Sequence, residues 1–190
     1  MNLEVKRQWR LLTLWLGLLF SLGAQAASAP DFVISSAHVF ERHQVYYLDA
    51  KAKLRLDGNL ASALQNGVGL VFVWDIRIMR PHGWWFDNTL ASLSTRYRLR
   101  YQPLSQRYRV DDLNSGVSHS YWSLSQALQR IGRLQDFPLI DQSLLLPERP
   151  LFVDLRVRIS AAALPLPLRI RSYLDASWRP ASKWFRCDLR

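Results

Sequence analysis

Residues 93–111 read LSTRYRLRYQPLSQRYRVD, and this stretch decides the fold class. Apolar side chains alternate with arginines on both sides of a four-residue turn, which is the period of two expected of strands with one buried face. The register that closes this turn places Leu99 opposite Val110. A slip of one residue would place Leu99 opposite Arg109, so the hydrophobic pattern selects the first register. The stretch therefore predicts an antiparallel hairpin.

Strands with the same alternation are predicted before this hairpin, at residues 32–40, 45–56 and 68–79. On the outer side of the hairpin, the selected register makes Arg98 face Asp111 and Arg100 face Arg109. Polar residues thus gather on one side of the predicted sheet and apolar residues on the other.

A second hairpin is predicted toward the carboxyl end from two further alternating runs, 151–159 and 166–170. A register that keeps the alternation places Asp154 near Arg171 and Arg156 near Arg169. This hairpin would extend the arginine-bearing outer side of the sheet.

Two short helices are predicted between the strands. Asn59 is the expected N-cap of the first, which Gly67 would end. The second follows a capping box formed by Ser123 and Gln126 and would end at Gly132.

The number and type of elements point to a mainly β protein. Residues 133–150 contain three prolines and are predicted to be irregular. About eight strands with two short helices favour an antiparallel β-sandwich, Ig-like in its general architecture. An α+β fold with a mixed sheet is the alternative.

The first 26 residues have the three parts of a secretory signal peptide. Three cations precede an apolar run from Leu11 to Leu22, and Ala24-Gln25-Ala26 forms an A-x-A cleavage site. The run is shorter than the roughly 20 residues of a permanent membrane span. The sequence predicts a cleaved signal peptide (residues 1–26), a periplasmic location and a single mostly-β domain (residues 27–190). The alternative is an uncleaved signal that anchors the protein in the inner membrane.

The chain is strongly basic. Its formal net charge is +10, or +8 after the three cations and one anion of the leader are removed. In an exported protein this charge points to anionic lipid, lipopolysaccharide or acidic protein surfaces rather than to nucleic acid. Cys187 has no second cysteine to pair with in the chain, so stability must come from the core.

Four stretches carry a resemblance to a known family: LASALQNG (60–67), RIMRPHGWWFD (77–87), YQPLSQRY (101–108) and ALPLPLR (163–169). On these motifs the chain resembles a family of proteobacterial exported proteins, described as a domain of unknown function or as proline-rich signal peptide proteins. The resemblance covers most of the mature domain and implies no catalytic or binding residues. It implies a regulatory context, because such proteins look similar to ones encoded beside a membrane sensor histidine kinase.

Motifs for common enzyme and metal chemistry are not found in the sequence. The four histidines, His38, His43, His82 and His119, are scattered without a carboxylate or cysteine cluster that would complete a metal site. Ser118-His119-Ser120 and the pair Asp111-Asp112 place neighbouring groups on opposite faces of a strand. We therefore expect no catalytic, cofactor-binding or metal-binding residues. An envelope hydrolase is the less favoured reading.

Two candidate binding surfaces remain. The first is the outer side of the predicted sheet, with Arg96, Arg98, Arg100, Arg107, Arg109, Arg156, Arg158, Arg169 and Arg171. Opposed arginines repel one another, so this side either meets an anionic partner or is a solvated face whose arginine stems cover apolar surface. The second is Trp84-Trp85-Phe86, which either caps the core or forms a docking edge for a protein or membrane.

The sequence thus predicts a non-enzymatic interaction or regulatory module of the cell envelope that needs no cofactor. The expected partner is an envelope protein, and the periplasmic part of a sensor histidine kinase is the specific candidate. The alternative is a module that binds anionic lipid or lipopolysaccharide. Nucleic acid is not an expected partner.

Overall fold

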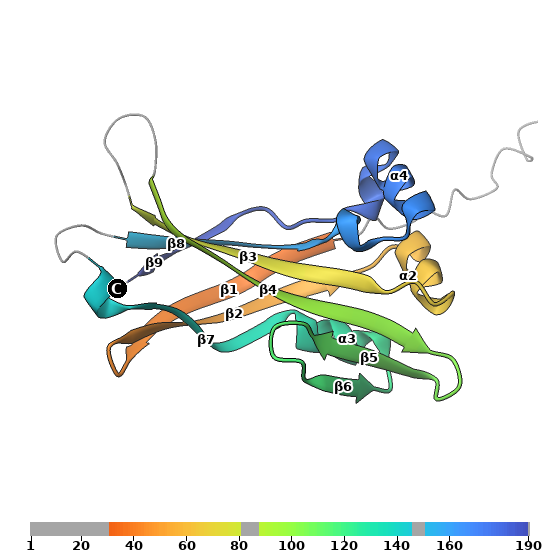
Figure 1. Ribbon diagram of the computed structural model, residues 1–190, viewed down its shortest axis with the longest axis horizontal. Coiled ribbons are helices and arrows are strands. Elements are labelled where there is room, and N and C mark those ends of the chain that lie inside the picture. The colour runs from red at the N-terminus through yellow and green to blue at the C-terminus, as the bar shows by residue number, and fades with distance from the viewer. Residues whose placement is uncertain (1–30, 81–87, 146–150, 190) are drawn as a thin grey trace, which may run out of the picture.

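The structure is a computed structural model that describes residues 31–80, 88–145 and 151–189 (Figure 1). In this part of the chain two antiparallel sheets are formed. The three-stranded sheet has the order β1-β2-β7, with β1 (Asp31–Arg42), β2 (Val45–Arg55) and β7 (Arg133–Asp141). The six-stranded sheet has the order β6-β5-β4-β3-β8-β9. Its strands are β3 (Leu70–Arg80), β4 (Asn88–Gln102), β5 (Arg107–Asp112), β6 (Ser118–Tyr121), β8 (Leu151–Ile159) and β9 (Phe185–Leu189).

The core lies between the two sheets. Along β3 the even-numbered side chains Phe72, Trp74 and Ile76 are fully buried, because this strand is central and its even face looks toward the three-stranded sheet. Phe32 of β1 stacks on Phe72 with ring centroids 5.9 Å apart, so the two sheets meet directly. All the strand pairs are antiparallel, which confirms the mainly β, sandwich-like prediction over the mixed-sheet alternative.

The β4–β5 hairpin has the predicted register. Leu99 pairs with Val110 and Arg98 with Asp111, and the chain turns at 103–106. Leu99 and Val110 are buried, as the hydrophobic pattern requires.

The helices fit the sequence in part, and there are three α-helices in the described residues rather than two. α3 (Leu124–Ile131) is capped by Ser123, whose side chain accepts a hydrogen bond from the backbone N–H of Gln126. α2 (Gly58–Gln65) is capped by Asp57 and not by Asn59, so the predicted N-cap was two residues too late. The buried Asp57 carboxylate accepts from the Leu60 N–H at 2.8 Å.

The second predicted hairpin is wrong. Residues 166–170 lie in α4 (Leu166–Leu174), and β8 pairs with β3 and β9 instead. Asp154 therefore lies opposite Arg186 rather than near Arg171, and Arg156 lies opposite Asp75 rather than near Arg169. A short run in which every second residue is apolar fits one turn of helix almost as well as a strand, and proline is tolerated in the first helical turn.

Residues 133–141 form strand β7, so the prediction of an irregular segment was wrong there. Pro138 lies in this strand opposite Tyr47 of β2. Because β7 is at the edge of its sheet, a proline without an N–H removes no bond to a second neighbour. The proline signal was therefore compatible with a strand.

The two long sides of the sandwich are closed differently. On one side β1 packs against β9, so strands from the two ends of the chain are in contact. On the other side α3 lies between the sheets and packs against β2, β5, β6 and β7 (Figure 1). Among the described residues, no helix covers the centre of the outer face of the six-stranded sheet (Figure 1).

Candidate binding surface

Strand alternation produces a continuous arginine face on the outer side of the six-stranded sheet. On β4 and β8 buried side chains alternate with outward-pointing ones, and strand pairing aligns these outward positions with those of β3, β5 and β9. We define the arginine face by Arg77, Arg96, Arg98, Arg100, Arg107, Arg109, Arg156, Arg158 and Arg186. The aspartates on the same side are Asp75, Asp111, Asp154 and Asp188. Arginines therefore outnumber aspartates more than two to one across this surface.

Asp111 joins three donors at one end of the face. Its Oδ2 accepts from Arg100 Nη2 at 2.7 Å, and its Oδ1 accepts from Arg109 Nε at 2.7 Å. Ser118 Oγ also donates to Oδ1, at 2.7 Å. Burial disfavours the charged carboxylate, but the bonds from Ser118, Arg109 and Arg100 outweigh it and lower the pKa to about 2. The repulsion expected between opposed Arg100 and Arg109 is thus relieved by a shared anion.

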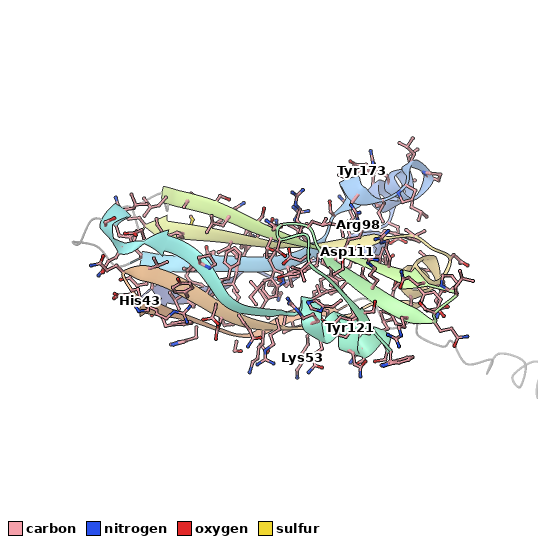
Figure 2. The ribbon with its side chains drawn as sticks, turned by 60° about the horizontal axis from the view of Figure 1, so that its bottom comes forward. His43, Lys53, Arg98, Asp111, Tyr121 and Tyr173 are labelled. Atoms are coloured by element: carbon pink, nitrogen blue, oxygen red, sulfur yellow. The ribbon has the colours of Figure 1, made fainter. Side chains whose placement is uncertain are left out.

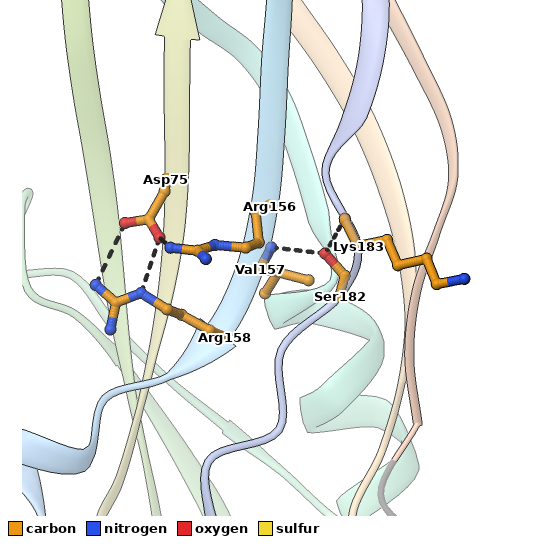
Figure 3. Close-up of polar contacts among 6 residues, drawn as sticks. All are labelled: Asp75, Arg156, Val157, Arg158, Ser182 and Lys183. Atoms are coloured by element: carbon orange, nitrogen blue, oxygen red, sulfur yellow. Dashed lines mark hydrogen bonds and ion pairs between the residues drawn. The ribbon is translucent and has the colours of Figure 1, made fainter. Parts of the chain in front are cut away.

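Asp75, near the middle of the sheet, also accepts hydrogen bonds from two arginines (Figure 3). Its Oδ2 accepts from Arg156 Nη2 at 2.9 Å and from Arg158 Nε at 2.8 Å. Burial raises the pKa of this carboxyl, yet the bonds from Arg158 and Arg156 prevail and the net shift is downward. One carboxylate again serves two arginines, which leaves each cluster with an excess positive charge.

The β8–β9 end of the arginine face contains an ion pair and two contacts between arginines and an aromatic ring. Arg186 binds Asp154 through Nε at 2.7 Å and Nη2 at 2.9 Å. The guanidinium groups of Arg77 and Arg156 lie 4.4 and 4.5 Å from the ring centroid of Trp184. Such cation–π contacts hold the arginines in place without neutralising them.

Arg96 and Arg98 differ from the others. Both are exposed on β4, and within the described residues neither side chain has an ion pair, a hydrogen bond or a ring contact. Their stems flank Val73 and Val71, which are buried although they are on the outer side of the sheet. Figure 2 shows Arg98 beside Asp111, on the opposite side of the molecule from Lys53.

The structure brings most of the predicted arginines together, but not all. Arg96, Arg98, Arg100, Arg107, Arg109, Arg156 and Arg158 share the arginine face. Arg169 and Arg171 are in α4, away from this face, because that segment is helical. Arg169 Nη2 donates to the backbone oxygens of Ala162 and Leu164. Trp84, Trp85 and Phe86 lie outside the described residues.

Sequence reasoning missed several members of the surface. Asp75 and Arg77 occupy odd positions of β3, whose even positions carry an apolar run that is buried, so the alternation of this strand could have found them. Trp184 and Arg186 depend on strand β9, which was not predicted. The guanidinium of Arg107 lies 3.7 Å from the ring centroid of Trp122, and no local sequence pattern indicated this cation–π pair.

The histidines considered for metal binding are dispersed among the described residues, whereas Ser118 and Asp111, considered for catalysis, are hydrogen-bonded to each other. His38, His43 and His119 are all exposed and lie on separate elements, while His82 lies outside the described residues. No group of three or more His, Cys, Asp or Glu side chains in the described part of the chain could hold a metal ion. A cavity of about 540 Å³ between the end of β2 and α3 is lined by Leu54, Leu124, Lys53 and other residues, without an acid or a histidine.

The fold and the surface define a class: an antiparallel two-sheet β protein with one basic outer face. The chain belongs to the family described as Domain of unknown function (DUF4390), whose model matches residues 29–188. This confirms the resemblance to a family described as a domain of unknown function. Comparison with curated proteins and with solved structures gave no significant match. Across residues 31–80, 88–145 and 151–189, no helix is long and apolar enough to cross a membrane.

Proposed function

We propose that this protein is a non-enzymatic interaction module of the cell envelope that binds an acidic segment of a partner protein on its arginine face. The periplasmic part of a membrane sensor kinase is the partner that the family resemblance suggests. The proposal includes export to the periplasm after cleavage of residues 1–26.

The observation that supports it is the pairing pattern of the arginine face. Asp75 and Asp111 each serve two arginines, and Arg96 and Arg98 on the strand between them have no partner in the described residues. The guanidinium groups of Arg96 and Arg98 therefore lie between arginines that are held in place by aspartates. Each can bind a carboxylate through two hydrogen bonds. Because the flanking arginines are already held by aspartates and rings, little side-chain freedom would be lost on binding.

The geometry favours a protein partner over a small molecule. The arginine face extends across five strands, from Arg107 on β5 to Arg186 on β9, and is a sheet surface rather than an enclosed pocket. Small ligands are usually bound in concave sites that remove most of their surface from water. An extended acidic segment can instead contact several rows of arginines at once.

The test compares the exported form, residues 27–190, with the double variant Arg96→Glu/Arg98→Glu in crosslinking and pull-down from an envelope fraction. These two arginines are chosen because reversing Arg100 or Arg109 would also break the Asp111 cluster. Lys53→Glu/Arg55→Glu is the matched control, since it makes the same charge change on exposed positions of the other sheet.

A discrete envelope protein captured by the native form and the control, but reduced tenfold or more in the arginine variant, is the expected result. Equal capture by all three folded proteins would contradict the proposal. Recovery of lipid without protein would contradict it as well, and would favour the anionic-lipid alternative on this face.

A further inference from the structure

Helix α4 directs its apolar side chains into solvent. Leu166, Ile170, Tyr173 and Leu174 follow the i, i+4, i+7, i+8 spacing of one helix face, and their exposed fractions lie between 63% and 87%. Figure 1 shows that α4 stands out from the two sheets, and Figure 2 shows Tyr173 on this helix. An apolar helix face is normally the one that is buried.

The opposite side of α4 attaches the helix to the domain. Arg169 Nη2 donates to the backbone oxygens of Ala162 and Leu164, which precede the helix. Ser172 is fully buried, and Leu168 packs against the core. These contacts hold one side of the helix and leave its apolar face pointing outward.

A basic cavity adjoins this face. It has a volume of about 480 Å³ between α4 and the end of β8, and its lining includes Arg158, Arg179, Tyr173 and Ser160 but no acidic residue. The Arg179 guanidinium lies 5.7 Å from the Tyr173 ring centroid, so a cation stands directly beside the apolar face. The lining offers charged and hydroxyl donors of the kind that bind phosphate oxygens.

The same end of the molecule joins the amino-terminal part of the chain. Strand β1 begins at the α4 end of the long axis, and the turn between β4 and β5 is also at this end (Figure 1). This turn includes the fully exposed Leu104. The residues that precede Asp31 include the apolar run Leu11–Leu22, which the sequence predicts to be part of a signal peptide.

We propose that the α4 end of the domain docks on a bilayer that contains anionic phospholipid. Leu166, Ile170, Tyr173 and Leu174 enter the boundary between headgroups and acyl chains, while Arg158 and Arg179 contact lipid phosphates. A protruding amphipathic helix with no acidic residue and with arginines beside its apolar side chains suits an interface better than it suits a protein groove. This surface shares Arg158, which binds Asp75, with the arginine face, but it includes neither Arg96 nor Arg98, so the inference does not depend on the protein-binding proposal.

The test is co-sedimentation of the exported form with phosphatidylcholine vesicles that contain about a quarter phosphatidylglycerol. Ile170→Gln/Leu174→Gln removes apolar surface while keeping good helix formers, and should lower the partition coefficient about tenfold or more. Arg179→Glu should lower it about fivefold, with a smaller effect on pure phosphatidylcholine. Val117→Gln/Leu144→Gln, which alters two other exposed apolar residues, should bind like the native form.

Absence of vesicle binding by the native form would overturn the proposal. So would equal binding by the native form and the α4 variant once both are shown to be folded. If Arg96→Glu/Arg98→Glu abolished vesicle binding while the α4 variant bound normally, lipid contact would belong to the arginine face and the role of α4 would be refuted. A loss confined to the α4 and Arg179 variants supports it.

Discussion

At the scale of single residues, Asp111 shows how the arginine face is stabilised. Two arginines that face each other across β4 and β5 would repel, yet both bind this carboxylate and hold its pKa at about 2. The charge of the face is thus part of the fold as well as a property of the surface. Only Arg96 and Arg98, among the described arginines of this face, remain outside such clusters or ring contacts.

Asp111→Asn should lower the free energy of unfolding at neutral pH by about 2 kcal/mol, because it removes charge-assisted hydrogen bonds and leaves Arg100 opposite Arg109. The native pKa is depressed below its ordinary value of 3.8 to about 2, so the stabilisation is present above pH 4 and is lost as the pH falls toward 2. Urea unfolding across this range should show the two proteins converging by about 1 kcal/mol, after allowance for solvent screening of the exposed arginines.

Asp31→Asn is the control, since Asp31 is an exposed carboxylate on β1. A constant difference between Asp111→Asn and the native protein from pH 6 to about 2 would show that the carboxylate does not act through its charge.

At the scale of elements, the docking of α3 on β2 is unusually close. A Cβ added at Gly132, just after α3, would lie within clashing distance of the Ala52 backbone oxygen. That oxygen belongs to the residue whose N–H donates to Gly132 O at 2.7 Å, so the contact fixes the helix on the strand. Trp74 Nε1 donates to Ile131 O at 2.9 Å, and this second hydrogen bond holds the end of α3 against β3 in the core.

Gly132→Ala should therefore destabilise the protein by about 2 kcal/mol or more, because backbone must move to admit the methyl group. Gly58→Ala is the matched control in α2, where an added Cβ meets no atom within 4 Å, and it should be neutral or stabilising. Thermal and chemical denaturation of the three proteins would measure both effects. Equal stability of Gly132→Ala and the native protein would contradict this close contact.

The elements also show what the sequence could and could not predict. The β4–β5 hairpin was predictable because a tight turn and an uninterrupted alternation leave one register for Leu99. The α4 segment was not, since Leu166, Leu168 and Ile170 alternate as in a strand although they lie on a helix in the structure. Most of the arginine face was predicted because the alternation in β4 and β5 is uninterrupted. Its β9 members were missed because a strand of five residues is too short to show a clear alternation.

At the scale of the whole molecule, closure of the sandwich depends on β9. This strand pairs with β8 and packs against β1, so it covers one long side of the core. Cys187 lies at its centre, opposite Val153. Burial, together with Asp188 and Asp154, raises the pKa of the thiol to about 11.

Cys187 should consequently report on whether the sandwich is closed. At pH 8 the native thiol should react with a thiol reagent about a hundredfold more slowly than the unfolded chain, since its thiolate fraction is smaller by about that factor. Rates followed across a urea titration should rise with global unfolding. Reaction of the native thiol at the unfolded rate would mean that β9 is open in solution, which would also disconnect Trp184 and Arg186 from the arginine face.

The contact between β1 and β9 has a consequence for the order in which the domain is completed during synthesis. β1 pairs with the neighbouring β2, but it meets β9 only after the intervening residues 43–184 have been made, so no segment that lacks β9 can cover this side of the core. A chain that emerges from its amino end therefore leaves this side of the core open until β9 follows.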